Sequence, residues 1–76
     1  FYWGYRTVDV VEGVGEVSFR GDIFDIFPSN LTKPIRISLF DDEVESIREF
    51  ECESQKSYKE ELESIEIYPA VFALNQ

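Results

Sequence analysis

The chain has 76 residues, a length typical of one small domain, and 43% of them are hydrophobic, including 7 Phe, 4 Tyr and 1 Trp. That share of apolar side chains is enough for a folded core and argues against disorder. The net charge of −9, from 16 acidic and 7 basic residues, argues against direct binding to nucleic acid or to an anionic membrane surface, because both rely on Lys and Arg.

The N-terminal part is predicted to form β-strands separated by glycine turns. Residues 7–11 alternate between apolar and polar side chains, and the turn that follows at 12–15 contains two glycines. Residues 16–27 have a strand pattern on both sides of Gly21, and a glycine inside such a run indicates a bulge or the close approach of another backbone.

The clearest strand pattern covers residues 35–40, after a proline-containing loop at 28–34. A turn at 41–42 then leads into residues 43–50, whose apolar side chains recur every three positions. This period fits either a helix or a bulged strand. We predict a strand, because residues 35–40 need a hairpin partner.

The C-terminal part is more polar. Residues 51–57 are predicted to be a loop, 58–63 one helical turn, 65–70 a last short strand and 71–76 a linker. The predicted fold class is therefore mainly β or α+β, a small antiparallel sheet of about five strands with at most one short helix.

Catalytic and metal-binding signals are weak. The chain has no His, its single Cys52 has no imidazole partner, and it has no phosphate-binding glycine loop. The adjacent acids Asp41, Asp42 and Glu43 lack the spacing of a calcium loop, and a solvated hairpin turn explains them better. We expect a domain that is not an enzyme and that holds no catalytic residue, cofactor or metal.

The lack of a second cysteine, of a membrane-spanning run and of a visible signal peptide indicates the cellular setting. A single cysteine excludes an internal disulfide and is typical of a reducing cytosol. No apolar run is long enough to span a bilayer and no signal peptide is visible at this end. Because the first residue is Phe1 rather than Met, we expect a domain taken from a larger protein.

One strand carries an unusual pair of outward side chains. Alternation along residues 35–40 places Arg36 and Phe40 on the face opposite the apolar positions, and Arg20 has the equivalent place in the earlier strand. If these strands are neighbours, the three residues form one patch of the types that dominate binding hot spots. Alternatively, Phe40 packs under the hairpin or against a neighbouring domain, and the arginines pair with this chain's own carboxylates. The pattern alone leaves both open.

A long stretch of the chain resembles a known family. The residues are GYRTVDVVEGVGEVSFRGDIFDIFPSNLTKPIRISLFDDEVESIREFECESQKS. This sequence is similar to the UvrA-binding domain that the bacterial transcription-repair coupling factor shares with the excision-repair protein UvrB. The segment after residue 50 is more similar to that of the coupling factor. The resemblance covers residues 4–70, with 71–76 left as a linker to the next domain of the parent.

The resemblance implies a docking role. In that family the arginine of the R-G motif, the arginine of the I-R-I strand and an aromatic residue further along that strand contact UvrA, and these positions are Arg20, Arg36 and Phe40 here. Two positions depart from the family pattern, because Ser38 replaces an acidic residue and Leu39 replaces an aromatic one.

The resemblance also places the fragment in a larger protein. It implies the bacterial cytoplasm, UvrA and the flanking domains of the parent as partners, and ATP with magnesium only in the parent's motor domains. The fragment would recruit UvrA to stalled RNA polymerase for nucleotide excision repair. Two alternatives stay open, namely the equivalent domain of UvrB and a purely structural β domain.

Overall fold

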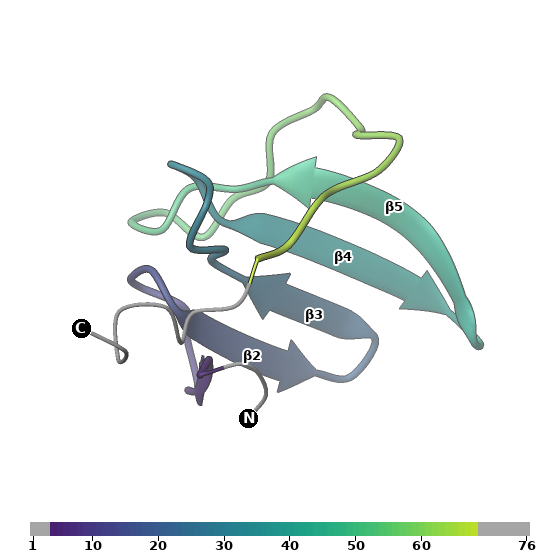
Figure 1. Cartoon of the computed structure of the whole chain (residues 1–76). Helices are drawn as coiled ribbons and strands as arrows, with labels where there is room; N and C mark the ends of the chain where they lie inside the picture. Colours follow the sequence, from purple (N-terminus) through teal and green to yellow (C-terminus); the bar gives the residue numbers. More distant parts are fainter. Residues whose placement is uncertain (1–3, 69–76) are drawn as a thin grey trace.

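The computed structural model describes residues 4–68, which form one five-stranded sheet with the strands in chain order (Figure 1). From β2 to β5 each strand is antiparallel to its neighbour, and β1 is parallel to β2. No helix occurs in this range. The mainly β prediction is therefore confirmed. The strands are β1 (Arg6–Thr7), β2 (Glu16–Arg20), β3 (Ile23–Ile26), β4 (Ile35–Phe40) and β5 (Glu43–Glu49).

Two tight turns set the register of the sheet. Gly21 adopts a φ of 59° between β2 and β3, so it makes a hairpin turn rather than the bulge or close approach that its place in the sequence suggested. Asp41, with a φ of 55°, occupies the turn between β4 and β5. A bulge between Ser38 and Leu39 shifts the pairing of these two strands, which explains the irregular pattern of residues 43–50.

The segment after the sheet differs from the prediction. Residues 58–63 form no helical turn and residues 65–68 form no strand. Instead, the backbone N–H of Tyr58 donates to Glu49 O at 2.9 Å and that of Leu62 donates to Ile47 O at 2.7 Å. The N–H groups at positions 58 and 62 are therefore bonded to carbonyls of β5. In a helical turn they would instead bond to carbonyls four residues earlier in the chain.

The predicted strand at 7–11 is also shorter than expected. Strand pairing stops at Thr7 because the chain then leaves the sheet edge, and Val11 becomes fully buried elsewhere in the fold. The last two residues of the predicted strand at 65–70 and the predicted linker at 71–76 lie outside the described residues.

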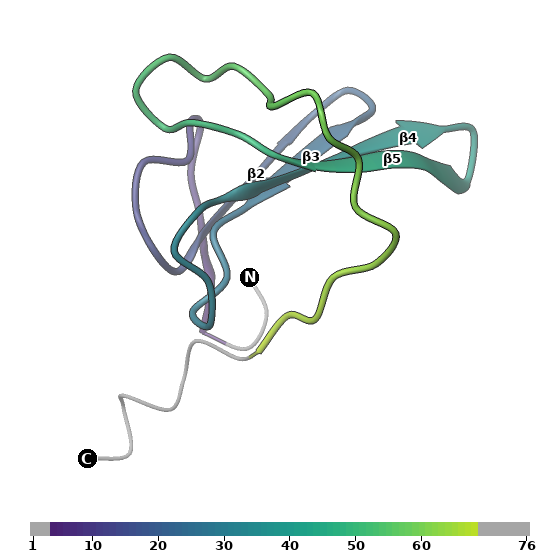
Figure 2. The same cartoon turned by 90° about the horizontal axis from the view of Figure 1, so that it is seen from above.

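The main hydrophobic core lies on one face of the sheet. Its buried members are Tyr5, Val17, Ile26 and Ile35. The segment that follows β5 crosses this face, as Figures 1 and 2 show, and packs three apolar side chains against the core, namely Leu62, Ile65 and Ile67. Full burial of an aliphatic side chain of this size stabilises a fold by about 1.5–3 kcal/mol, and these three side chains contribute less because they are partly buried.

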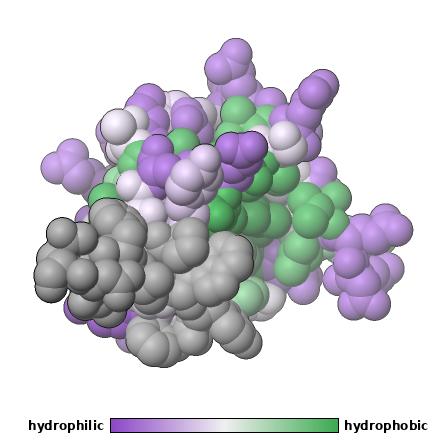
Figure 3. Space-filling view, viewed as in Figure 1, coloured by the Kyte–Doolittle hydropathy of each residue, from purple (hydrophilic) through white to green (hydrophobic). Residues whose placement is uncertain are grey.

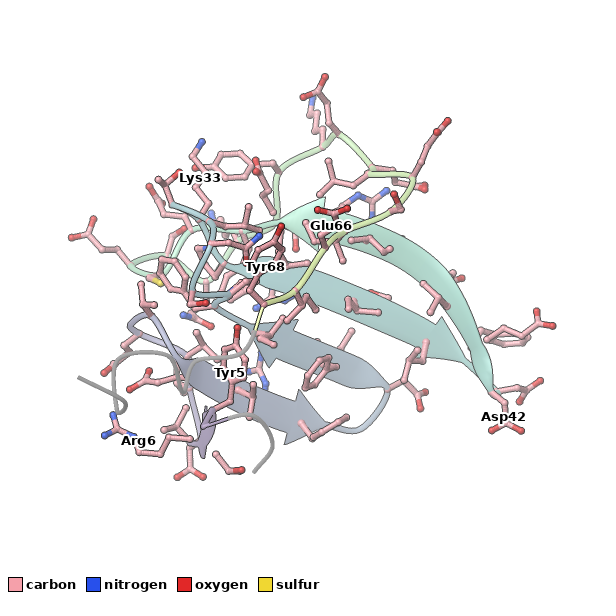
Figure 4. All side chains as sticks on the ribbon, viewed as in Figure 1. Tyr5, Arg6, Lys33, Asp42, Glu66 and Tyr68 are labelled. Carbon is pink, nitrogen blue, oxygen red and sulfur yellow. The ribbon has the colours of Figure 1, made fainter. Side chains whose placement is uncertain are left out.

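The opposite face has its own cover. Phe50 and Val11 are fully buried there, and the loop at residues 51–57 connects them, because Gln55 Nε2 donates to Val11 O at 3.1 Å. Figure 2 shows this loop on the other side of the sheet from the segment that covers the core. Both covers leave the β4–β5 hairpin tip open, where Figure 4 places Asp42, far from Lys33.

Candidate functional site

The register brings the three predicted site residues to one face of the sheet. Arg36 pairs with Asp25, and Phe40 lies further along β4, opposite Glu43. Arg20 pairs with Ile23 on the same face. Because β3 lies between β2 and β4, the two arginines are not on neighbouring strands, and a side chain of β3 connects them.

Phe40 is the most open of the three. Its side chain is 67% exposed at the end of β4, directly before the turn formed by Asp41 and Asp42, both exposed. An exposed phenylalanine beside charged neighbours offers a large apolar surface to a partner at little cost in conformational entropy.

Arg20 is partly free. Its side chain is 50% exposed and makes one ion pair, from Nη2 to Asp25 Oδ2 at 3.0 Å. Its other N–H groups have no partner among residues 4–68. Most donors of the planar guanidinium therefore remain open.

Arg36 is on the predicted face but is largely covered, with 15% of its side chain exposed. Nε and Nη2 form a fork on Asp25 at 2.9 and 3.0 Å, and Nη1 donates to Gln55 O at 2.8 Å. The guanidinium carbon lies 4.3 Å from the centre of the Phe50 ring. The loop at 51–57 therefore turns an outward arginine into an internal contact.

Asp25 is the residue that the sequence interpretation missed. It is 1% exposed and accepts hydrogen bonds from both arginines. The available signal was its position between Phe24 and Ile26 in an otherwise apolar strand, since a buried charge requires a partner. The identity of that partner depends on the pairing of β3 with β4, which the strand pattern does not give.

The end of the sheet opposite the hairpin tip has a hollow of about 340 Å³, whose lining includes Lys33, Phe50, Cys52 and Tyr58. Burial raises the pKa of the Cys52 thiol, and the negative charges of Glu16 and Glu12 raise it further. The thiol therefore stays protonated at neutral pH, which disfavours nucleophilic chemistry because the thiolate is the reactive form.

Residues 4–68 show neither a metal cluster nor a membrane-spanning helix. Within residues 4–68, no group of three or more His, Cys, Asp or Glu side chains is arranged to hold a metal ion. The same range has no helix with the length and hydropathy needed to cross a bilayer.

The chain is similar to a family of interaction domains in DNA repair proteins. Residues 2–71 match the family model described as "UvrB interaction domain". The chain is 53% identical over 76 residues to a transcription-repair-coupling factor of Helicobacter pylori and 51% identical over 67 residues to that of Bacillus subtilis. It spans 8% and 6% of the length of these relatives, and the matches cover 100% and 88% of the chain.

Proposed function

Because this chain belongs to the family of UvrB interaction domains, we propose that it is the docking module through which a bacterial transcription-repair coupling factor binds UvrA. Its role would be to recruit UvrA to stalled RNA polymerase for nucleotide excision repair. The ATP-driven motor of such a protein would lie in the parts of the relatives that this chain does not span.

The observation that carries the proposal is that an exposed aromatic and a partly free arginine lie on the same face of the sheet. Phe40 is 67% exposed and Arg20 is half exposed on the same face of the sheet. A phenylalanine and an arginine with open donors are typical anchor residues of protein interfaces. This chemistry supports protein binding rather than catalysis.

In the proposed mechanism an aromatic ring and a guanidinium make different contributions to the contact with UvrA. Phe40 fills an apolar pocket on UvrA, which removes its ring from water and supplies most of the affinity. Arg20 donates to a carboxylate or carbonyl group on UvrA and fixes the orientation. Arg36 contributes at the inner edge of this surface, where 15% of its side chain remains exposed.

The proposal is tested by the change Phe40→Ala in a calorimetric titration of the chain with purified UvrA. Truncation of an anchor residue typically costs about 2 kcal/mol or more, so we expect affinity to fall by about 30-fold or more. Circular dichroism should stay unchanged, because the ring is mostly exposed. Wild-type affinity in this variant would contradict the proposed surface.

The chain offers a matched control on its other face. Phe19 is 65% exposed, nearly as open as Phe40, but it lies on the core face, where its ring stacks on Phe24 with centroids 4.4 Å apart. Phe19→Ala should therefore bind UvrA like the wild type. Loss of binding in Phe19→Ala with retention in Phe40→Ala would move the docking surface to the other face.

The apolar face supports a second candidate role, packing against flanking parts of the parent. Figure 3 shows apolar side chains gathered beside the segment that crosses this face, and the exposed or partly exposed ones are Phe19, Phe24, Leu39 and Val44. In the purely structural alternative this face alone is used, in contacts with flanking parts of the parent, and the wild-type chain does not bind UvrA.

A further inference from the structure

We infer that Asp25 is a positioning residue of the docking surface, which holds Arg36 inside the domain and keeps Arg20 oriented at the surface. This inference rests on the proposed function, because it explains how Asp25 contributes to the affinity of the domain for UvrA. It differs from that proposal in naming a buried residue that the partner does not contact.

The geometry is that of one carboxylate shared by two guanidiniums. Asp25 Oδ2 accepts from Nη2 of Arg20 and from Nη2 of Arg36, each at 3.0 Å. Its other oxygen accepts from Arg36 Nε at 2.9 Å. The two bonds to Arg36 form a fork, a geometry that fixes the plane of the carboxylate as well as its position.

The surroundings make this carboxylate rigid. Asp25 is 1% exposed and lies on β3 between two paired strands, and Arg36 is held in turn by the carbonyl of Gln55 and the ring of Phe50. Arg20 therefore bonds to a fixed acceptor. A long side chain that is already restrained loses less conformational entropy when it binds a partner, which favours affinity.

The shared carboxylate also sets the charge that a partner meets. Within the group formed by Asp25, Arg20 and Arg36, one carboxylate and two guanidiniums leave one net positive charge, which the half-exposed Arg20 carries. This arrangement fits a single acidic group on the partner. It offers little to an extended acidic cluster, which requires several free cations.

A double-mutant cycle separates positioning from simple stabilisation, because it measures whether two residues act through each other. The cycle uses Arg20→Ala, Asp25→Asn and both changes together in the 76-residue chain, titrated with purified UvrA. With Asp25 present, we expect Arg20→Ala to weaken binding about 30-fold. In the Asp25→Asn chain, the same change should cost about threefold or less, since Arg20 is then no longer held in place.

The control is another arginine-bonded acid at the other end of β2. Glu16 accepts from Arg6 Nη2 at 2.7 Å and from the backbone N–H groups of Glu12 and Gly13. Glu16→Gln removes a carboxylate with a comparable set of bonds, but it lies far from Phe40 along the sheet. It should bind UvrA as tightly as the wild type.

If Asp25→Asn fails to fold, the cycle is repeated in the chain that carries both Asp25→Asn and Arg36→Gln. A neutral pair replaces the buried ion pair there, so no buried charge is left without its partner. An equal cost of Arg20→Ala with and without Asp25 would overturn the inference and leave the docking proposal standing. Absence of UvrA binding by the wild-type chain would overturn both.

Discussion

The two ends of strand β4 differ sharply although they present the same face. At its start, Arg36 is bonded through all three guanidinium nitrogens and stacks on Phe50. At its end, Phe40 is 67% exposed. The position of a side chain along the strand therefore decides its exposure as much as the face on which it lies.

The cause of the difference is the loop that follows β5. Residues 51–57 fold back over the start of β4, where Gln55 O accepts from Arg36 and Ser57 pairs with Phe50 in an isolated bridge. The hairpin tip has no such cover among the described residues. The start of β4 is therefore buried in a small second core, and the hairpin tip remains exposed to solvent.

The strongest test of this comparison is the stability of two Phe→Ala variants. Phe50 is fully buried, so Phe50→Ala should lower the free energy of unfolding by about 3–5 kcal/mol. A chain of 76 residues has a total stability of about 4–11 kcal/mol, so this variant should be close to unfolding. Phe40→Ala should change the same quantity by about 0.5 kcal/mol or less.

Urea unfolding followed by circular dichroism measures both values. The change Phe19→Ala serves as the reference for an exposed ring on the core face. Equal losses of stability in Phe50→Ala and Phe40→Ala would mean that the two ends of β4 are equally covered, and the comparison would fail.

A smaller effect is expected from the two arginines. Arg36→Met keeps most of the side chain's apolar stem but removes the fork on buried Asp25, and should lower the free energy of unfolding by about 2–3 kcal/mol. Arg20→Met removes one partly exposed ion pair and should cost about 0–1 kcal/mol. The same urea experiment measures both variants, and a larger loss in Arg20→Met would reverse the assigned roles.

The smallest effect concerns pH at the other end of the sheet. The hydrogen bond from the Glu12 N–H lowers the pKa of Glu16 despite opposing burial, and bonds from Arg6 and Gly13 lower it further. The folded state therefore gains stability from ionised Glu16 at neutral pH. This gain declines as the pH falls below the ordinary value of about 4.3 and through the folded pKa.

The pH effect is isolated by comparing the wild type with Glu16→Gln. The difference in their free energies of unfolding should be largest near neutral pH and should shrink toward zero in acid. A difference that grows as the pH falls would contradict the lowered pKa of Glu16. UvrA binding at neutral pH should be the same for both chains, because Glu16 lies away from the proposed surface.

Much of the fold follows from local patterns. The strands at 16–20, 23–26 and 35–40 follow the alternation of apolar residues, and turn residues separate them. The bulged strand at 43–49 was predicted as the hairpin partner of 35–40. The family prediction was confirmed because its motifs are spread along most of the chain. The helical turn predicted at 58–63 was wrong, since the backbone N–H groups of Tyr58 and Leu62 bond to carbonyls of β5.

The sequence by itself determined which side chains share a face, because alternation along a strand is a local property of the backbone. It therefore placed Arg36 and Phe40 together and opposite the core. Only the tertiary structure decided that Arg36 is covered, that Asp25 is shared by two arginines and that Phe40 stays open. These outcomes depend on the order and register of β2, β3 and β4 and on the fold-back of residues 51–57, which are contacts between segments distant in the chain.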